Sequence, residues 1–151
     1  MKLNVIIPSK NGFHHLQECL PTVLRAVSLP PMEVQVIVVD DNSTDQTVDN
    51  ISAMFPTIQV LKNPDKGACS ARNFGVRNTS CDWICFLDND VFLEETFFQT
   101  IQKYLNQDVF CITCADYAAY PIDPAQEEQL DGVKLLQWKR GFPRFTGNIY
   151  N

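Results

Sequence analysis

Residues 34–39 read VQVIVV and are followed directly by Asp40, Asp41 and Asn42. Five of these six residues are β-branched, which is a composition typical of strands. The run is almost continuously apolar, and this indicates a strand that is buried on both faces, as strands of parallel sheets are. Parallel strands need helical crossovers, so strands and helices are expected to alternate on both sides of this run.

The flanking sequence supplies that alternation. Short apolar runs between turn residues predict the strands, and apolar residues at helical spacing predict the helices. The predicted strands cover residues 3–7, 34–39, 58–61, 83–87 and 109–114, with 133–138 as a weaker candidate. The predicted helices cover residues 13–27, 43–54, 68–76 and 94–105. The expected fold class is therefore α/β, a mostly parallel open sheet with helices on both faces, with residues 3–115 as its regular core.

Three local signals refine the helices. Residues 43–46 (STDQ) have the pattern of a capping box and are expected to begin the second helix. Pro21 interrupts the first helix, where a split or a kink is expected. The last helix is expected to place an apolar side toward the core, made of Phe97, Phe98, Ile101, Tyr104 and Leu105.

Length and charge exclude several classes of protein. A chain of 151 residues has the size of one domain. Its net charge of -6 disfavours a general nucleic-acid binder, because such proteins carry the opposite sign. The longest apolar runs are too short to span a bilayer. The first residues lack the pattern of a signal peptide, so a cytoplasmic location is the expectation.

The six cysteines are expected to be free thiols. They are Cys19, Cys69, Cys81, Cys85, Cys111 and Cys114. Cys111 and Cys114 have the spacing of a redox or zinc pair, but residues three apart in a strand face opposite sides. No second pair and no nearby histidine completes a zinc site, so a reduced setting fits the pattern better.

Polar clusters follow the predicted strands one after another. They begin at Pro8, Asp40, Lys66 and Asp88. In open parallel sheets, ligands bind outside the carboxyl ends of the strands, and these ends share one edge. The convergence of four clusters at that edge indicates a binding site more strongly than any one cluster does.

The cluster Asp88-Asn89-Asp90 has the spacing of a site for a hard divalent cation. Two carboxylates one residue apart can hold Mg²⁺ or Mn²⁺, which keeps several waters and pairs with substrate phosphates. The alternative is an Asx turn that ends the strand. The tripeptide D-x-D alone does not decide between them.

The other clusters also have two interpretations. Asp40 and Asp41 can contact a base or ribose or act as helix caps, a role that Ser43 already fills. Lys66 and Gly67 precede a helix whose free N–H groups can bind an anion, and Arg72 on that helix can alternatively form a surface salt bridge. Neither a G-x-G-x-x-G motif nor a phosphate-binding loop motif occurs, which argues against a dehydrogenase and an ATPase. His14 and His15 have no accompanying nucleophile and are interpreted as surface or packing residues.

Taken in order, these segments resemble family 2 glycosyltransferases, which have the GT-A nucleotide-sugar fold. The similar segments are residues 5–11 (VIIPSKN), 38–45 (VVDDNSTD), 66–75 (KGACSARNFG) and 86–90 (FLDND). The third is similar to the family's K-G-x-x-x-A-R-N-x-G helix, and the fourth to its D-x-D metal site. Order and spacing agree across roughly residues 3–105.

The resemblance implies a role for each matched position. The implied nucleotide-sugar site consists of Pro8, Ser9, Lys10, Asp40, Lys66, Gly67, Arg72, Asp88, Asn89 and Asp90. Asp40 would contact the base, and Asp88 and Asp90 would hold Mn²⁺ or Mg²⁺ against the sugar diphosphate. The resemblance implies a metal-dependent, inverting transfer of a sugar from a nucleotide-diphosphate sugar, with UDP-sugars as the first choice of donor. It also implies a saccharide, lipid-linked or protein acceptor, as in cell-surface polysaccharide synthesis, and often work at the cytosolic face of a membrane.

The sequence departs from the family pattern in two places. Position 10 is lysine where the family often has an aromatic residue. Family members continue beyond this length, and their general base is a later carboxylate, whereas the last acidic residue here is Asp131. Residues 116–151 are therefore expected to begin an acceptor-side region that is incomplete.

Two alternatives to a glycosyltransferase remain. The first is a non-catalytic nucleotide-sugar-binding module or an inactive fragment. The second is a nucleotidyltransferase, which would need a glycine-rich basic loop after the first strand, whereas residues 8–12 contain one glycine.

Overall fold

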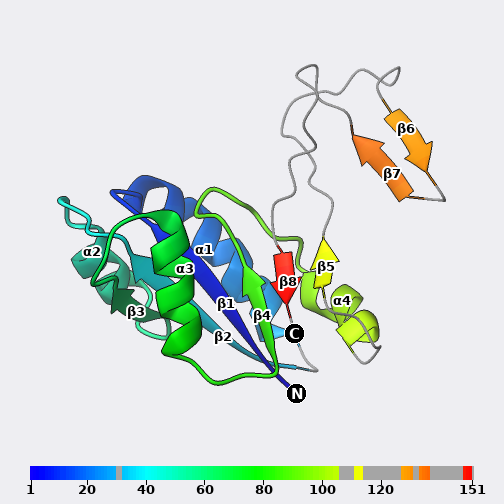
Figure 1. The fold of residues 1–151 in the computed structure, drawn as a ribbon, viewed down its shortest axis with the longest axis horizontal. Helices are drawn as coiled ribbons and strands as arrows, with labels where there is room; N and C mark the ends of the chain where they lie inside the picture. The colour runs from blue at the N-terminus through cyan, green and yellow to red at the C-terminus, as the bar shows by residue number, and fades with distance from the viewer. Residues whose placement is uncertain (30–31, 106–110, 114–126, 131–132, 137–147, 151) are drawn as a thin grey trace.

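The computed structural model describes residues 1–29, 32–105, 111–113, 127–130, 133–136 and 148–150. Within them, a six-stranded sheet has the order β3-β2-β1-β4-β8-β5 (Figure 1). Its strands are β1 (Lys2–Ser9), β2 (Glu33–Asp40), β3 (Gln59–Lys62), β4 (Trp83–Phe86), β5 (Cys111–Thr113) and β8 (Asn148–Tyr150). The helices are α1 (Phe13–Ser28), α2 (Thr47–Met54), α3 (Ala68–Arg77) and α4 (Phe97–Leu105).

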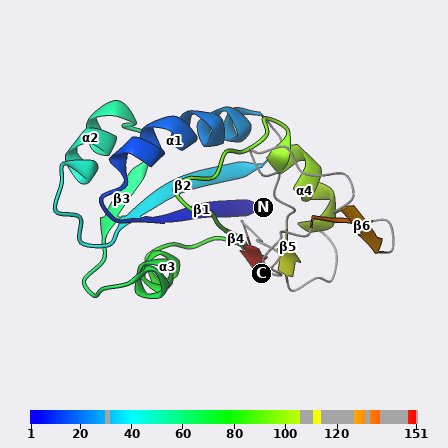
Figure 2. The ribbon, with the colours of Figure 1, turned by 90° about the horizontal axis from the view of Figure 1, so that it is seen from above.

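The sheet is mostly parallel and has helices on both faces, as the sequence predicts. β1 pairs in parallel with both β2 and β4, and β2 pairs in parallel with β3. β8 is antiparallel to both β4 and β5. Seen along the sheet, α1 and α2 cover one face and α3 covers the other (Figure 2). The strand of residues 34–39 lies inside β2 and is buried over Val36–Val39, in agreement with its composition.

The larger core lies under α1. Leu16, Leu20 and Val23 recur at helical spacing on α1 and are fully buried against the sheet. Phe98 and Ile101 of α4 join the same cluster. Burial of large apolar side chains stabilises a fold by about 1.5–3 kcal/mol each, so this face supplies most of the stability of the sheet.

The α3 face has a smaller core that depends on one glycine. Ile6, Ile37 and Val39 of the sheet pack against Ala71 of α3. A Cβ atom on Gly75 would lie 2.8 Å from Cγ2 of Ile6. Glycine at this position therefore lets α3 lie close against the sheet, which places the start of α3 beside the ends of the strands.

The first strand continues through Pro8 to Ser9, two residues beyond the predicted end. The carbonyl of Ile6 accepts a hydrogen bond from Leu87, which identifies the side of this strand that faces β4. The nitrogen of Pro8, two residues later, points to the same side, and β4 has already ended at Phe86. No ladder hydrogen bond is lost, so proline is tolerated in a central strand.

The expected split at Pro21 is wrong, because α1 is one helix from Phe13 to Ser28. Proline removes the hydrogen bond to the carbonyl of Gln17, and Gln17 is exposed, so water can replace the missing donor. The tertiary burial of α1 on both sides of Pro21 outweighs this local cost.

The predicted capping box is also wrong. The helix α2 begins at Thr47, and Gln46 at its N-cap makes no side-chain capping bond. Asp45 instead accepts hydrogen bonds from the Thr47 backbone nitrogen at 3.0 Å and from the Thr47 hydroxyl at 2.5 Å. The bond from this hydroxyl lowers the pKa of Asp45. Ser43 is used in a contact between loops, described below.

The predicted helix over residues 94–105 begins later, at Phe97. Phe98, Ile101 and Leu105 are buried as expected, whereas Tyr104 is 41% exposed and does not belong to the apolar side. Residues 94–96 are exposed and precede the helix.

The remaining predictions concern the end of the chain. The predicted strand at 109–114 appears as β5, and residues 109, 110 and 114 lie outside the described residues. The weaker candidate at 133–138 appears as β7 (Val133–Leu136), paired antiparallel with β6 (Glu127–Leu130). β6 was not predicted, because its sequence EEQL has neither apolar alternation nor β-branched residues.

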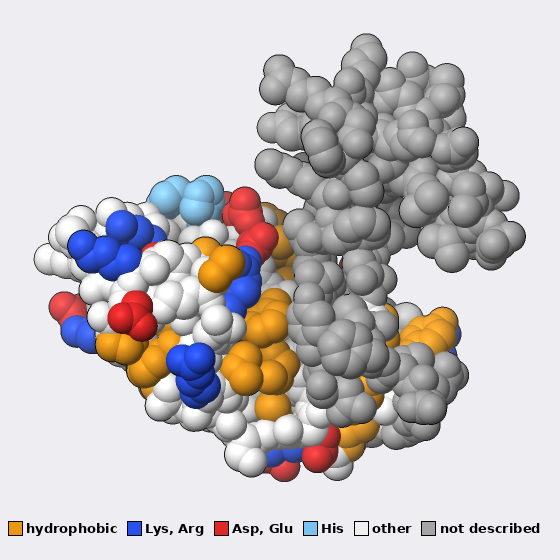
Figure 3. Space-filling model, in the orientation of Figure 1, with side chains coloured by type: hydrophobic (Ala, Val, Ile, Leu, Met, Phe, Trp, Pro, Cys, Tyr) orange, Lys and Arg blue, Asp and Glu red, His pale blue; other side chains and the backbone are white. Residues whose placement is uncertain are grey.

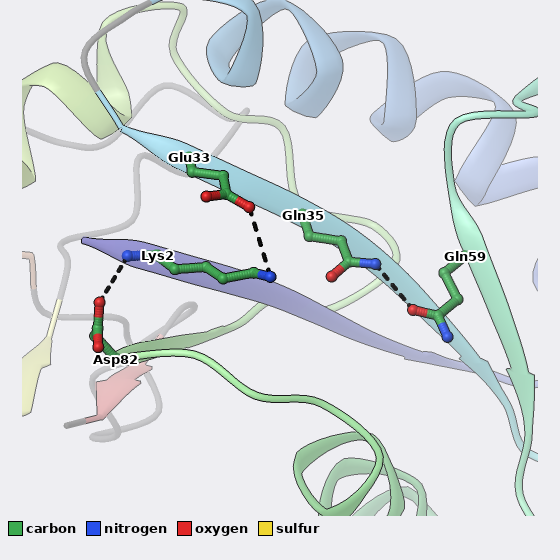
Figure 4. Close-up of polar contacts among 5 residues, drawn as sticks. All are labelled: Lys2, Glu33, Gln35, Gln59 and Asp82. Carbon is green, nitrogen blue, oxygen red and sulfur yellow. Dashed lines mark hydrogen bonds and ion pairs between the residues drawn. The ribbon is translucent and has the colours of Figure 1, made fainter.

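Polar side chains join the strands at the amino end of the sheet (Figure 4). The Lys2 backbone nitrogen donates to Asp82 at 2.8 Å, and its ammonium group lies 3.5 Å from Glu33. Gln35 on β2 donates to Gln59 on β3 at 3.0 Å. These exposed contacts contribute little energy each. The polar residues at this end of the sheet therefore contact one another across neighbouring segments. This end lies opposite the one where ligands are expected.

One buried residue of β1 is expected to limit stability. Asn4 is 0% exposed, and neither polar atom of its side chain has a hydrogen-bond partner among the residues that the structure describes. An unpaired buried amide costs about 1–3 kcal/mol. We therefore expect Asn4→Val, which also suits a strand, to raise the free energy of unfolding by about 1–2 kcal/mol in urea denaturation. A variant no more stable than the wild type would show that the amide has a partner.

Candidate functional site

Four loops meet at the carboxyl edge of the parallel strands. The first loop (residues 8–12) ends β1, the second (40–46) ends β2, the third (63–67) ends β3, and the fourth (87–96) ends β4. The register pairs Ser9 with Asp40 and Asp40 with Lys62, so neighbouring strands end side by side. The predicted convergence of the polar clusters at one edge is confirmed.

Asn11 joins the first loop to the second. Its backbone nitrogen donates to the Ser43 hydroxyl at 2.8 Å, and its side-chain oxygen accepts from the Thr44 nitrogen at 2.8 Å. Asn11 has a positive φ of 49°, which asparagine tolerates better than most residues. Ser43 therefore fixes a loop rather than the start of a helix.

Asp41 joins the second loop to the third. It is 8% exposed, and both of its carboxylate oxygens lie 2.9 Å from the Gly67 nitrogen. Its Oδ1 also accepts from the Asn63 amide at 2.9 Å. Gly67 has a φ of 103°, which side-chain-bearing residues rarely adopt. Asp41 thus holds the turn that leads into α3.

Asp40 and Asn42 complete this part of the site. Asp40 is 4% exposed, and its carboxylate accepts from the Ser43 nitrogen at 3.3 Å. Asn42 has a φ of 60° and donates to the carbonyl of Asp65 at 2.5 Å. The structure shows neither acidic residue in the alternative role of a helix cap, since no side-chain capping bond is made at the start of α2 or α3. Both carboxylates accept from nitrogens of the loops instead. The predicted contact of Asp40 with a base stays a prediction.

Arg72 joins α3 to the fourth loop. Its guanidinium lies 2.6 Å from Oδ1 of Asp88, and the two side chains are 31% and 49% exposed. The sequence offered a salt bridge as the alternative to a ligand contact for Arg72. The structure forms that salt bridge, and its partner Asp88 is a predicted metal ligand. The salt bridge therefore places Arg72 beside the predicted ligand site and does not exclude a ligand contact.

Asn89 joins the fourth loop back to the first. Its side-chain nitrogen donates to the Ser9 hydroxyl at 2.9 Å. A Cβ atom on Gly12 would lie 2.3 Å from both of these polar atoms. We call these four connections the loop ring. They are the bonds of Asn11 to Ser43 and Thr44, of Asp41 to Asn63 and Gly67, of Arg72 to Asp88, and of Asn89 to Ser9. The ring brings the matched clusters into one continuous site.

The fourth loop is also held against α1. The Leu93 nitrogen donates to the Thr22 hydroxyl at 3.1 Å. Val91 and Leu93 pack against the larger core, while Phe92 between them is 58% exposed. The turn that carries Asp88 and Asp90 is therefore fixed at both of its ends.

The carboxylates of this turn fit a hard divalent cation by their chemistry. Asp90 is exposed and Asp88 half exposed, so both carboxylates are accessible. Within the described residues, no group of three or more His, Cys, Asp or Glu side chains could hold a metal on its own. Two carboxylates with waters and substrate phosphates are the usual set for Mg²⁺, so the donor set agrees with a cation that arrives with a phosphate ligand.

The predicted site residues differ in their accessibility. Pro8 and Ser9 are buried in the strand end, whereas Lys10 and Lys66 are exposed. Reasoning from the sequence missed the linking roles of four residues, namely Asn11, Gly12, Asp41 and Asn63. Their only signal is their position after a strand, since their partners lie far along the chain.

The two histidines lie on the surface, as expected. His14 and His15 are exposed, with ring centroids 3.8 Å apart. They form the pale blue area at the upper edge of Figure 3, with acidic side chains beside it in that view. Among the cysteines whose side chains are described, Cys19, Cys69 and Cys81 are free thiols, and Cys19 and Cys85 are buried.

Cys19 gives the stability a defined pH dependence. Burial raises the pKa of its thiol from 9.0 to about 12, and the charge of Asp90 acts in the same direction. As pH rises, the thiol loses its proton in the unfolded chain near pH 9, before it does so in the folded chain. The free energy of unfolding is therefore unaffected by this group below about pH 9 and decreases as pH rises from 9 toward 12. Between about pH 9 and 10, we expect wild-type unfolding free energy to fall by about 1 kcal/mol more than that of Cys19→Ala in urea titrations. Parallel pH profiles would contradict this assignment.

In the described residues, no helix has both the length and the apolar character needed to cross a bilayer.

Comparisons with known sequences agree on one protein family. The family described as Glycosyl transferase family 2 matches residues 4–150. An uncharacterized glycosyltransferase of Haemophilus influenzae is 32% identical over 143 residues, which are 89% of this chain and 48% of that protein. Glycosyltransferase GlyA of Streptococcus pneumoniae is 26% identical over 122 residues, which are 79% of this chain and 17% of that protein. The chain thus spans less than half the length of these two relatives.

Solved structures give the same fold. Staphylococcus aureus TarS in complex with UDP-GlcNAc has a TM-score of 0.62 and 25% identity, covering 70% of this chain and 31% of TarS. The mannosyltransferase PcManGT of Pyrobaculum calidifontis, in complex with GDP-Man and Mn²⁺, has a TM-score of 0.66. It is 22% identical and covers 76% of this chain and 35% of that enzyme, a likeness that shows the fold alone.

Proposed function

The chain belongs to glycosyl transferase family 2, and from this premise we propose that it binds a nucleotide-diphosphate sugar and takes part in transferring the sugar to an acceptor hydroxyl. Its fold is the GT-A nucleotide-sugar fold. The observation that carries the proposal is the loop ring. It gathers two accessible carboxylates, an arginine and the turn before α3 at the carboxyl edge of the sheet, where ligands of such folds bind.

The donor is proposed to lie across the ring. Pro8, Ser9 and Lys10 line the nucleotide pocket, and Asp40 contacts the base. The exposed Lys66 stands on the turn fixed by Asp41. Lys66, Gly67 and Arg72 lie near the base, ribose or diphosphate. The UDP-GlcNAc complex of TarS supports a UDP-sugar as the first donor to test.

Asp88 and Asp90 are proposed to hold Mn²⁺ or Mg²⁺, with Asn89 between them at the sugar side of the site. Their chemistry, two accessible carboxylates one residue apart, supports this choice of metal. When bound, the ion supplies a Lewis acid that neutralises charge on the departing nucleoside diphosphate. Arg72 already contacts Oδ1 of Asp88, so it orients that carboxylate and adds a second positive charge near the diphosphate.

The transfer is proposed to invert the anomeric centre. A general base takes the proton of an acceptor hydroxyl, the hydroxyl oxygen bonds to the anomeric carbon, and the bond to the diphosphate breaks. We assign this base to no residue of the chain. The proposed acceptor is a saccharide, a lipid-linked or a protein hydroxyl, as in cell-surface polysaccharide synthesis. The proposed place is the cytoplasm, at the inner face of a membrane.

Isothermal titration calorimetry with UDP, and with GDP as the second nucleotide, tests the donor site. We expect binding that is strengthened by Mn²⁺ and weakened by EDTA. Absence of binding for both nucleotides, with and without Mn²⁺, would overturn the proposal. Binding without turnover, measured as no release of UDP from UDP-GlcNAc with any saccharide acceptor tested, would favour a non-catalytic nucleotide-sugar-binding module instead.

A further inference from the structure

The link between Asn89 and Ser9 connects two parts of the site that are 80 residues apart in sequence. The Asn89 side-chain nitrogen donates to the Ser9 hydroxyl at 2.9 Å. Ser9 is 4% exposed, so its hydroxyl has little access to water as a replacement partner. A buried acceptor that loses its donor is costly, which makes this contact a specific one rather than a chance surface contact.

Gly12 shows how tightly this contact is enclosed. A Cβ atom there would lie 2.3 Å from the Asn89 nitrogen and 2.3 Å from the Ser9 hydroxyl oxygen. Real Cβ atoms do not approach polar atoms this closely, so only glycine leaves room for the bonded pair. Gly12 is also the first residue before α1, whose position is fixed by the larger core. The pair is thus held between the end of β1 and the start of α1.

We propose that Asn89 is a positioning residue, which through Ser9 fixes the turn carrying Asp88 and Asp90 and so determines how much a divalent cation strengthens the binding of a nucleoside diphosphate. The inference rests on the proposed function. Its physical basis is that two ligands one residue apart must keep their mutual orientation to hold one cation. Asn89 is the residue between them, and its amide is the contact that ties this turn to the first loop.

The test measures the affinity of UDP in EDTA and in Mn²⁺ by calorimetry and takes the ratio of the two dissociation constants. Asn89→Leu removes the amide at similar length, and we expect the ratio to fall about tenfold, as for lost partners of metal ligands. Gly12→Ala is expected to reproduce the loss, because its methyl group displaces the pair.

A double-mutant cycle separates positioning from a general structural effect. If the two residues act only through their bond, Ser9→Ala combined with Asn89→Leu lowers the ratio no further than Asn89→Leu alone. Asn89→Asp should keep the ratio at or above the wild-type value, because the Ser9 hydroxyl can donate to a carboxylate and the added charge also favours the cation. Asn50→Leu on α2, outside the loop ring, is the control and should leave the ratio unchanged.

Three outcomes decide the inference. If Asn89→Leu keeps the wild-type ratio of the two dissociation constants, the inference is overturned. This holds even when thermal unfolding shows the variant to be less stable, because the bond would then affect stability alone. An equal loss in Asn89→Asp also overturns it, since the hydrogen bond would not be the cause. If wild type binds neither UDP nor GDP, the proposed function itself fails, and this inference fails with it.

Discussion

Replacing Asp88 or Asp90 by alanine is expected to remove the effect of Mn²⁺ on nucleotide binding. Each variant deletes one of the two carboxylates that the described residues supply to the proposed cation site, and a single remaining carboxylate holds a hard cation poorly. We expect the affinity for UDP in Mn²⁺ to fall about 100-fold, toward the value in EDTA. Calorimetric titration of each variant with UDP, in Mn²⁺ and in EDTA, measures this loss.

Two controls separate metal binding from the ion pair with Arg72. Asp88→Asn keeps an oxygen that can accept from Arg72 but removes the charge, so it should lose the Mn²⁺ effect while keeping the fold. Asp49→Ala removes a carboxylate in the first turn of α2, which is not part of the loop ring, and should bind like wild type. A full Mn²⁺ effect in both Asp88→Ala and Asp90→Ala would mean that the turn is only an Asx turn.

Asp41→Ala is expected to give the largest loss of stability among the loop variants. The substitution leaves the Asn63 amide and the Gly67 nitrogen without the carboxylate that both of them use. Hydrogen bonds to a charged, buried group are strong, so we expect the free energy of unfolding to fall by about 3 kcal/mol in urea denaturation. The turn before α3 should also lose its fixed position, which weakens nucleotide binding.

Asp65→Ala is the matched control, because Asp65 lies in the same third loop, is exposed, and contributes only backbone groups to the ring. Its stability is expected to stay within about 0.5 kcal/mol of wild type. Equal losses in Asp41→Ala and Asp65→Ala would show that the third loop responds to any substitution, and that the Asp41 carboxylate has no special role.

Local patterns predicted the four parallel strands and, apart from their exact ends, the helices α1 to α4, because the periodicity of apolar residues reflects burial directly. Residues 34–39 are the clearest case, since a run without polar alternation fits only a strand covered on both faces. The failures are places where tertiary contacts outweigh a local preference. Pro21 is kept inside α1 by the burial around it, and Ser43 bonds to Asn11 instead of capping α2.

The candidate site was predictable as a set of positions but not as a set of contacts. Asp88 and Asp90 could be selected from the sequence, because charged residues directly after strands converge on one edge. Arg72 could be selected because it lies on the helix that begins at that edge. Their partners could not. Nothing local indicates that Asp41 holds Gly67, 26 residues away, or that Asn89 bonds Ser9.

The sequence by itself determined the alternation of strands and helices, and with it the edge at which the four polar clusters meet. Those properties depend on the local order of apolar and turn residues. The tertiary structure alone decided that the clusters close into a ring, with Asn89 against Ser9 and Arg72 against Asp88. The physical reason is that β1 lies between β2 and β4, so β4, late in the chain, ends beside the first loop.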